Sequence, residues 1–261
     1  MISAENISVT IGGTDILREI NFQAFAGEVT AIVGPNGSGK TTLMKALTGD
    51  IPHAGRISLN GRDIVRCKPW ELAAVRGVLP QASVLAFPFT VIEVVRMGLR
   101  AGSSGAQGHR AMAALARVGL AGHAGRHFQN LSGGEQQRVQ LARVLAQVWE
   151  PLQDDTPRWL LLDEPVSSLD IAHQIEVMEI ARDYAKGGGG VVAVMHDLNL
   201  TAIYADRLTI LSAGEVLASG TPRDVMTGAT LSKAYGCKLD VSRIPEPGVP
   251  FVLPHGASLH T

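Results

Sequence analysis

A glycine-rich stretch that ends in lysine and threonine is the part of this sequence best suited to binding phosphate. The stretch GPNGSGKTT fits the pattern G-x-x-x-x-G-K-[ST] through Gly34, Gly39, Lys40 and Thr41. In such a loop the backbone N–H groups surround phosphate oxygens, the lysine reaches the β- and γ-phosphates, and the threonine hydroxyl binds Mg²⁺. Lys40 is therefore expected to act in catalysis as well as in binding. The residues predicted to contact a nucleotide here are Gly34, Pro35, Asn36, Gly37, Ser38, Gly39, Lys40, Thr41 and Thr42.

Polar residues that could complete a hydrolytic site follow three other apolar runs. Gln81 ends VRGVLPQ, Asp163 and Glu164 end RWLLLDE, and His196 ends GVVAVMH. Asp163 is expected to hold Mg²⁺ with Thr41, and Gln81 to complete the shell of the metal or of the water. Glu164 follows Asp163 and is expected to orient the attacking water as general base, because neighbouring strand residues point to opposite sides. His196 is expected to contact the γ-phosphate or hold that water. Singly, each residue also fits an ordinary structural role.

A second possible anion site lies at the start of the helix that begins with LSGGEQQR. Ser132 and Glu135 have the spacing of a capping box, in which each side chain bonds a backbone N–H of the first turn. Gly133 and Gly134 are poor helix formers, but without side chains they leave the terminal N–H groups open to an anion. Two interpretations remain open from these residues alone, a capped surface helix and a phosphate site.

Parallel strands are the elements that must position these groups. The apolar run at 29–33 leads into the glycine-rich loop, and a helix is predicted from the loop to about Gly49. The runs before Gln81, Asp163 and His196 have the continuous apolar character of strands buried on both faces. Ligands of open parallel sheets bind at the carboxyl ends of the strands, so all four ends should face one crevice. The fold class predicted is α/β.

Composition narrows the function classes. The chain has 261 residues, of which 46% are hydrophobic and 18% charged, enough for a sizeable core. Lys and Arg number 23 against 24 Asp and Glu, which argues against a nucleic-acid partner. We find neither the pattern of a secretory signal nor an apolar run of about 18 residues. The protein is therefore expected to remain in the cytosol.

Six motifs together, in their order and spacing, resemble those of the ATPase subunits of ABC transporters. They are GPNGSGKTT, Gln81, LSGGEQQR, LLLDEP, SSLD at 167–170 and VMHDLN. The resemblance covers about residues 2–226 and implies a P-loop NTPase with a RecA-like core, an N-terminal antiparallel β-subdomain and an inserted α-helical subdomain. It implies one domain over 1–261, in which 1–81 and 151–240 form the core with the β-subdomain. The helical subdomain that carries the signature would span 82–150, and a C-terminal extension 241–261.

The same resemblance implies a homodimer with two ATP molecules held between the copies. Ser132, Gly133 and Gly134 would bond the γ-phosphate of ATP held by the other copy, and Asp170 would reach across the same interface. Ile11 stands where the family usually has an aromatic residue that stacks on adenine. An aliphatic side chain lacks the π face for stacking. ATP and Mg²⁺ are nevertheless the expected ligands.

Within the family, FPFTVIEVVRMG and the segment from His196 to Met226 resemble the ATPases of importers for iron chelates, cobalamin and haem. The extra segment VWEPLQDDTPR is most similar to the haemin-importing branch, with cobalamin or ferric siderophore as the alternative cargo. The resemblance implies a peripheral protein on the cytoplasmic face of the bacterial inner membrane, bound to permease subunits and served indirectly by a periplasmic binding protein. The stretch SVLAFPFTVIEVV is either core or a groove for the permease.

A soluble ABC ATPase acting on DNA or ribosomes is the other functional class considered. Such proteins usually carry a coiled coil, tandem cassettes or basic extensions, none of which is evident in this sequence. A transport ATPase is therefore favoured.

Overall fold

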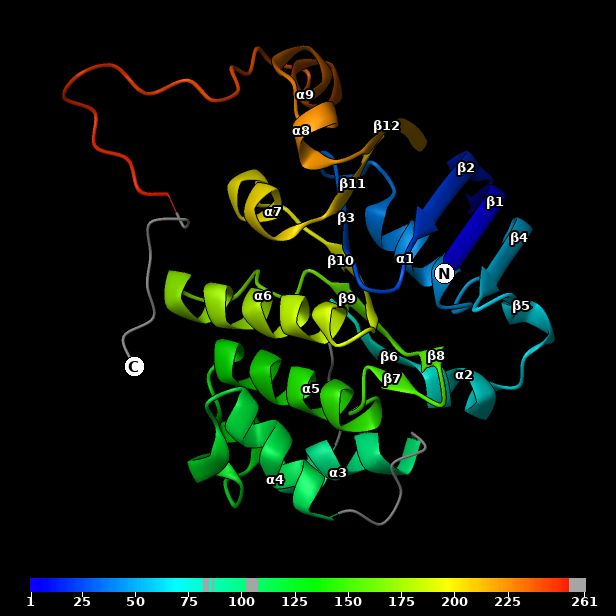
Figure 1. Ribbon diagram of the computed structural model, residues 1–261, viewed down its shortest axis with the longest axis vertical. Helices are drawn as coiled ribbons and strands as arrows, with labels where there is room; N and C mark the ends of the chain where they lie inside the picture. Colours follow the sequence, from blue (N-terminus) through cyan, green and yellow to red (C-terminus); the bar gives the residue numbers. More distant parts are fainter. Residues whose placement is uncertain (82–84, 86, 102–107, 254–261) are drawn as a thin grey trace.

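A six-stranded sheet forms the centre of the protein in the computed structural model, which describes residues 1–81, 85, 87–101 and 108–253 (Figure 1). Five strands run parallel, and the edge strand β12 is antiparallel to β11. In spatial order the strands are β12 (Glu215–Gly220), β11 (Arg207–Ser212), β3 (Val29–Val33), β10 (Gly190–Val194), β9 (Trp159–Asp163) and β6 (Arg76–Leu79). The predicted α/β class and its four parallel strands are confirmed.

A second, antiparallel sheet is built mainly from the first 24 residues, as the family resemblance implied. Its strands, in spatial order, are β2 (Thr14–Ala24), β1 (Ile2–Ile11), β4 (Ala54–Leu59) and β5 (Arg62–Asp63). A short 3-10 helix, η1 (Ile64–Arg66), and helix α2 (Pro69–Val75) then lead into β6.

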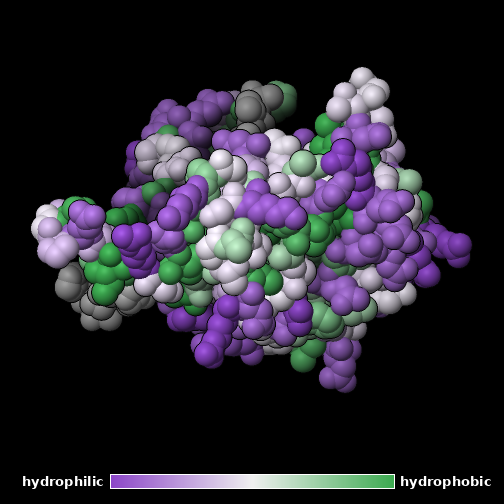
Figure 2. Space-filling view, turned by 90° about the horizontal axis from the view of Figure 1, so that it is seen from above, coloured by the Kyte–Doolittle hydropathy of each residue, from purple (hydrophilic) through white to green (hydrophobic). Residues whose placement is uncertain are grey.

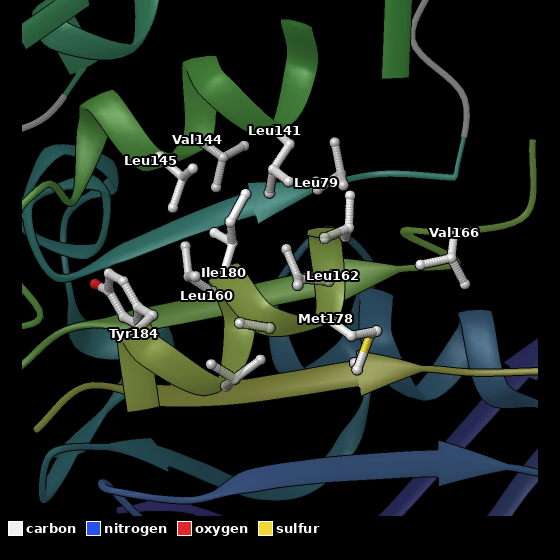
Figure 3. Packing of buried hydrophobic residues seen from close by; sticks show 14 of the residues in the cluster. Leu79, Leu141, Val144, Leu145, Leu160, Leu162, Val166, Met178, Ile180 and Tyr184 are labelled. Carbon is white, nitrogen blue, oxygen red and sulfur yellow. The ribbon is translucent and has the colours of Figure 1, made fainter. Parts of the chain in front are cut away.

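Alternating side chains of the six-stranded sheet divide the core into two layers. Leu161 of β9 packs in one cluster with β1, β2 and α1 (Lys40–Leu47). Leu160 and Leu162 pack in the other, with α5 (Gly133–Gln147) and α6 (Ile171–Lys186), as Figure 3 shows. The helix after the phosphate loop and the signature helix therefore cover opposite faces of one sheet.

Helices α3 (Val91–Ala101), α4 (Gly108–Arg117) and α5 lie between β6 and β9 in the sequence, with two 3-10 turns, η2 (Ala121–His123) and η3 (Phe128–Asn130). Helix α3 approaches α5 closely at Gly98, where an added Cβ would overlap the carbonyl oxygen of Arg143. These helices are the predicted helical insertion, and their apolar side chains are continuous with the core of the main sheet.

The apolar stretch at 83–95 divides by position. Val91, Val94 and Val95 are buried, which confirms the core interpretation for them, whereas Phe87 is 67% exposed. Residues 83, 84 and 86 lie outside the described part of the chain.

The extra segment before β9 forms a small hairpin of β7 (Leu152–Gln153) and β8 (Thr156–Pro157). Asp154 and Asp155 make its turn with φ of 49° and 55°, the left-handed values that a two-residue type I′ turn requires.

The C-terminal part contains α7 (Leu198–Tyr204), α8 (Pro222–Val225) and α9 (Gly228–Tyr235). The chain then runs without helix or strand to residue 253, away from the helices and strands in Figure 1. Of the predicted extension at 241–261, the structure describes residues 241–253. The predicted domain boundaries stay predictions.

Figure 2 shows hydrophilic and hydrophobic residues interspersed over the face that carries α8 and α9. None of the helices in the described part of the chain combines the length and the hydropathy that a membrane span requires.

Candidate functional site

The phosphate loop joins β3 to α1, and two of its glycines are required by the geometry. Gly39 caps α1 with a left-handed φ of 101°, a conformation that a side chain would strain. Gly34 lies so close to the backbone of β11 that an added Cβ would overlap the carbonyl oxygen of Leu211. The loop thus turns sharply and leads directly into the N-terminus of α1, where free N–H groups and the helix dipole favour an anion.

Lys40 is held inside this loop. The residue is 6% exposed, and Nζ donates to the carbonyl oxygens of Gly34 at 2.9 Å and Pro35 at 3.0 Å. Burial lowers the pKa of Lys40, while the carboxylates of Glu164 and Asp163 oppose that shift. The ammonium group is therefore positioned by the loop itself and adds positive charge where the helix dipole already favours phosphate.

The loop and the strand ends line one open pocket of about 350 Å³. It brings together the predicted Lys40 and Thr41 with Gln81, Glu164 and His196, which come from three different strand ends. Its lining residues are Ile16, Asn36, Gly37, Gly39, Lys40, Thr41, Thr42, Gln81, Glu164 and His196. Gly34 and Pro35 contribute through the carbonyls that hold Lys40.

Ile11 is not among these lining residues. It ends β1 with its side chain 52% exposed. Ile16, on β2, lines the pocket instead, and no feature of the sequence singled it out. Ile16 therefore supplies an aliphatic side chain to the pocket, and the contact of Ile11 with a nucleotide base stays a prediction.

Asp163 ends β9 as a buried carboxylate beside the phosphate loop. Thr41 Oγ1 donates to Asp163 Oδ1 at 3.4 Å. Burial raises the pKa of Asp163, and the nearby Glu164 carboxylate raises it further. The Asp163 carboxylate and the Thr41 hydroxyl, side by side in a partly buried site, are oxygen ligands of the kind that suits Mg²⁺. A divalent cation would also relieve the repulsion between the carboxylates.

Glu164 leaves the strand in a left-handed turn with φ of 53°. Strand alternation does not apply to this pair, because β9 ends at Asp163. The two carboxylates nevertheless have different partners, Thr41 for Asp163 and Gln81 and His196 for Glu164. A left-handed residue with a side chain costs about 1–2 kcal/mol. Such strain is typical of functional positions that the surrounding structure holds in place.

The Glu164 carboxylate is oriented by two other predicted residues. Its Oε1 accepts a hydrogen bond from Gln81 Nε2 at 2.9 Å and lies 2.7 Å from His196 Nε2. A neutral His196 with its proton on Nε2 donates to this oxygen. Both bonds use Oε1, and within the described residues no hydrogen bond reaches Oε2.

The signature helix begins as predicted, with Ser132 as the cap of α5. Glu135 N donates to Ser132 Oγ at 3.3 Å, and Ser132 N donates to Glu135 Oε2 at 2.8 Å. The two glycines differ, however. An added Cβ would meet nothing within 4 Å at Gly133, but at Gly134 it would lie 3.1 Å from the Ser168 carbonyl oxygen. Gly133 leaves the helix end open, whereas Gly134 permits close packing on the SSLD segment.

Asp170 lies beside this helix start in the same chain. It caps α6 through Oδ1, which accepts from His173 N at 3.0 Å and contacts His173 Nδ1 at 2.8 Å. A second open pocket of about 370 Å³ contains the signature and SSLD residues. It is lined by Ser132, Gly133, Gly134, Glu135, Arg138, Ser168, Leu169, Asp170 and His173.

The two pockets have no lining residue in common. They also start from helices on opposite faces of the sheet, α1 and α5. Each chain therefore presents two pockets with different lining residues, of which the first contains Glu164 and His196 and the second contains Glu135 and Asp170.

Comparison with known proteins gives consistent results. A family described as ABC transporter matches residues 17–167. The Hemin import ATP-binding protein HmuV of Jannaschia sp. (strain CCS1) is 63% identical over 255 residues, 98% of this chain and 94% of that protein. The protein of the same name from Roseobacter denitrificans (strain ATCC 33942 / OCh 114) is 62% identical over 257 residues, 98% of each chain.

Solved structures agree on the fold. An ATP-binding subunit of an ABC transporter aligns with a TM-score of 0.76 at 24% identity, over 86% of this chain and 91% of that one. An ATP-binding cassette in its ADP conformation aligns with a TM-score of 0.73 at 23% identity, over 90% and 97% of the two chains.

Proposed function

We infer that this chain, which belongs to the ABC transporter family, is the ATP-hydrolysing subunit of a transporter that imports haem. The observation that carries the ATPase assignment is the meeting of Lys40, Glu164 and His196 in one pocket beside the buried Asp163. The haem assignment rests on relatives more than 60% identical that are named as hemin import proteins. No residue of the pocket identifies the cargo.

The geometry supports distinct roles for the residues of the pocket in ATP hydrolysis. The N–H groups of the phosphate loop and Lys40 bind the phosphates and stabilise the charge that develops on them. Glu164, held by Gln81 and His196, orients the attacking water and accepts its proton. His196 keeps the carboxylate in place and reaches the same pocket.

Thr41 and Asp163 are the residues that would hold Mg²⁺, with Gln81 as the third predicted contributor. When bound, the cation supplies charge neutralisation on the phosphate oxygens.

The working unit proposed is a homodimer in which each ATP is held between two copies. The support is the separation of the two phosphate-binding pockets within one chain. The Ser132 end of α5 in one copy would complete the pocket of Lys40 in the other, and Asp170 would lie at the same interface. Loss of the γ-phosphate would then remove a group that both copies bind, which would loosen the dimer.

The dimer is proposed to lie on the cytoplasmic face of the bacterial inner membrane as a peripheral component. Its partners would be integral permease subunits, and a periplasmic binding protein would deliver cargo to them.

Replacing Ser132 with tryptophan tests the shared site. The variant is expected to bind ATP with a Kd within about twofold of the wild type, because Ser132 is not part of the Lys40 pocket. Its ATP-dependent dimer and its hydrolysis should fall at least tenfold, because the indole blocks the helix end (about 1.4 kcal/mol or more). Size-exclusion chromatography and a phosphate-release assay measure the two effects.

Thr227→Trp is the matched control, since Thr227 caps α9 in the same way, through Thr230 N at 3.1 Å. It should lose only helix-cap stability, about 1 kcal/mol, and keep dimerisation and turnover. Full-speed hydrolysis by monomeric Ser132→Trp would contradict the homodimer proposal.

Uptake into vesicles tests the cargo. The chain reconstituted with its co-purified permease should accumulate haem in an ATP-dependent manner. The complex carrying Glu164→Gln should not, because it cannot turn over ATP. Parallel assays with cobalamin and a ferric siderophore test the alternative cargoes. Uptake of either one, with none of haem, would refute the haem assignment and leave the ATPase assignment intact.

A further inference from the structure

One hydrogen bond connects the signature helix to the backbone of the proposed catalytic base in the same chain. Gln137 lies in the second turn of α5, and its Nε2 donates to the carbonyl oxygen of Glu164 at 2.8 Å. Gln137 lies in the signature string LSGGEQQR, but no pattern in the sequence indicates a role for it.

The backbone of Glu164 needs such contacts because its conformation is strained. With φ of 53° it relies on neighbours to hold the turn. Its N–H donates to the Val194 carbonyl oxygen at 3.2 Å, and its carbonyl also accepts from Ser167 N at 3.4 Å and from Ser167 Oγ at 3.3 Å. The Gln137 bond is the shortest of these four bonds, and among them it alone comes from the helical insertion.

The oxygen atom of the Gln137 amide indicates that this residue contributes little to the stability of the fold. Its Oε1 is buried and has no hydrogen-bond partner within the described residues. A buried amide with one end unsatisfied stabilises a fold little. Gln147, near the end of the same helix, contrasts with it, because its Nε2 donates to two carbonyl oxygens, of Ala73 and Arg76, each at 2.9 Å.

We propose that Gln137 is a positioning residue, which ties the backbone of Glu164 to the signature helix. A shift of the N-terminal part of α5 then moves the Glu164 carboxylate of the same chain. When the Ser132 end of α5 meets a phosphate held by the other copy, that contact is transmitted to the base of its own copy's site. This inference rests on the proposed ATPase function and adds a link between the two pockets of one chain.

Gln137→Met tests the proposal in the full-length protein, because methionine keeps the length of the side chain and removes its donor. We expect kcat for ATP hydrolysis to fall about ten- to hundredfold, because a base displaced by a fraction of an ångström orients the attacking water poorly. KM for ATP should stay within about twofold and Tm near the wild-type value. Gln137→Glu, which presents an oxygen in place of the N–H, should lose kcat in the same way and decides the question if the methionine variant folds poorly.

Gln147→Met is the matched control. It removes hydrogen bonds from a glutamine amide to backbone carbonyl oxygens, as Gln137→Met does, but at the C-terminal end of α5, opposite to Ser132. It should lower Tm and leave kcat within about twofold of wild type. The proposal is overturned if Gln137→Met and Gln137→Glu turn over ATP at the wild-type rate, or if their kcat falls no more than that of Gln147→Met. Wild-type protein is assayed in parallel, and its failure to hydrolyse ATP would instead refute the proposed function.

Discussion

Glu164→Gln is expected to lower kcat for ATP hydrolysis by about 10²–10⁴-fold while ATP still binds. The amide keeps the size of the side chain and an oxygen that can accept the bonds from Gln81 and His196. It cannot accept a proton from water. ATP affinity should be equal or higher, because one negative charge beside the phosphates is removed. The variant should therefore accumulate as an ATP-dependent dimer.

Single-turnover phosphate release, calorimetry with ATP and size-exclusion chromatography measure these three effects. Glu150→Gln is the control, since Glu150 is an exposed carboxylate paired with Arg110 at 3.2 Å, outside both pockets. An unchanged hydrolysis rate in Glu164→Gln would remove Glu164 from the role of base.

Lys40→Ala is expected to abolish measurable ATP binding, with Kd rising at least about hundredfold, or 2.7 kcal/mol. The ammonium is buried in the loop and held by two backbone carbonyls. Among the described residues, no other lysine or arginine lines the same pocket to replace it. The substitution also removes the hydrogen bonds that the carbonyl oxygens of Gly34 and Pro35 accept from Nζ.

Isothermal calorimetry with Mg-ATP gives the affinity, and thermal unfolding shows whether the variant is folded. Lys45→Ala is the matched control, because Lys45 lies on α1 too but is exposed and does not line the pocket. If Lys40→Ala binds ATP like the wild type, the phosphate-loop assignment is wrong.

The sequence was sufficient for the features that depend on local patterns. Glycine spacing at 34–39 predicts the loop because its turn and its bare N–H groups are properties of consecutive residues. Apolar runs that end at Gln81, Asp163 and His196 predict parallel strands because burial on both faces demands such runs. Parallel strands bring their carboxyl ends to one edge, which accounts for the meeting of Glu164, Gln81 and His196.

Contacts between segments far apart in the chain were decided only by the tertiary structure. The distinct roles of Gly133 and Gly134 depend on Ser168, 34 residues beyond Gly134, and local spacing carries no information about that approach. Ile16 rather than Ile11 lines the pocket because the packing of β2 beside the phosphate loop sets which side chain faces it.

By itself, then, the sequence was sufficient to predict the candidate residues for the chemistry and the strand ends on which they stand. Tertiary structure alone decided the left-handed turn at Glu164 and the Gln137 bond that holds it. The physical reason is that motif chemistry follows from residue type and spacing, whereas the orientation of a strained backbone follows from neighbours that only folding brings together.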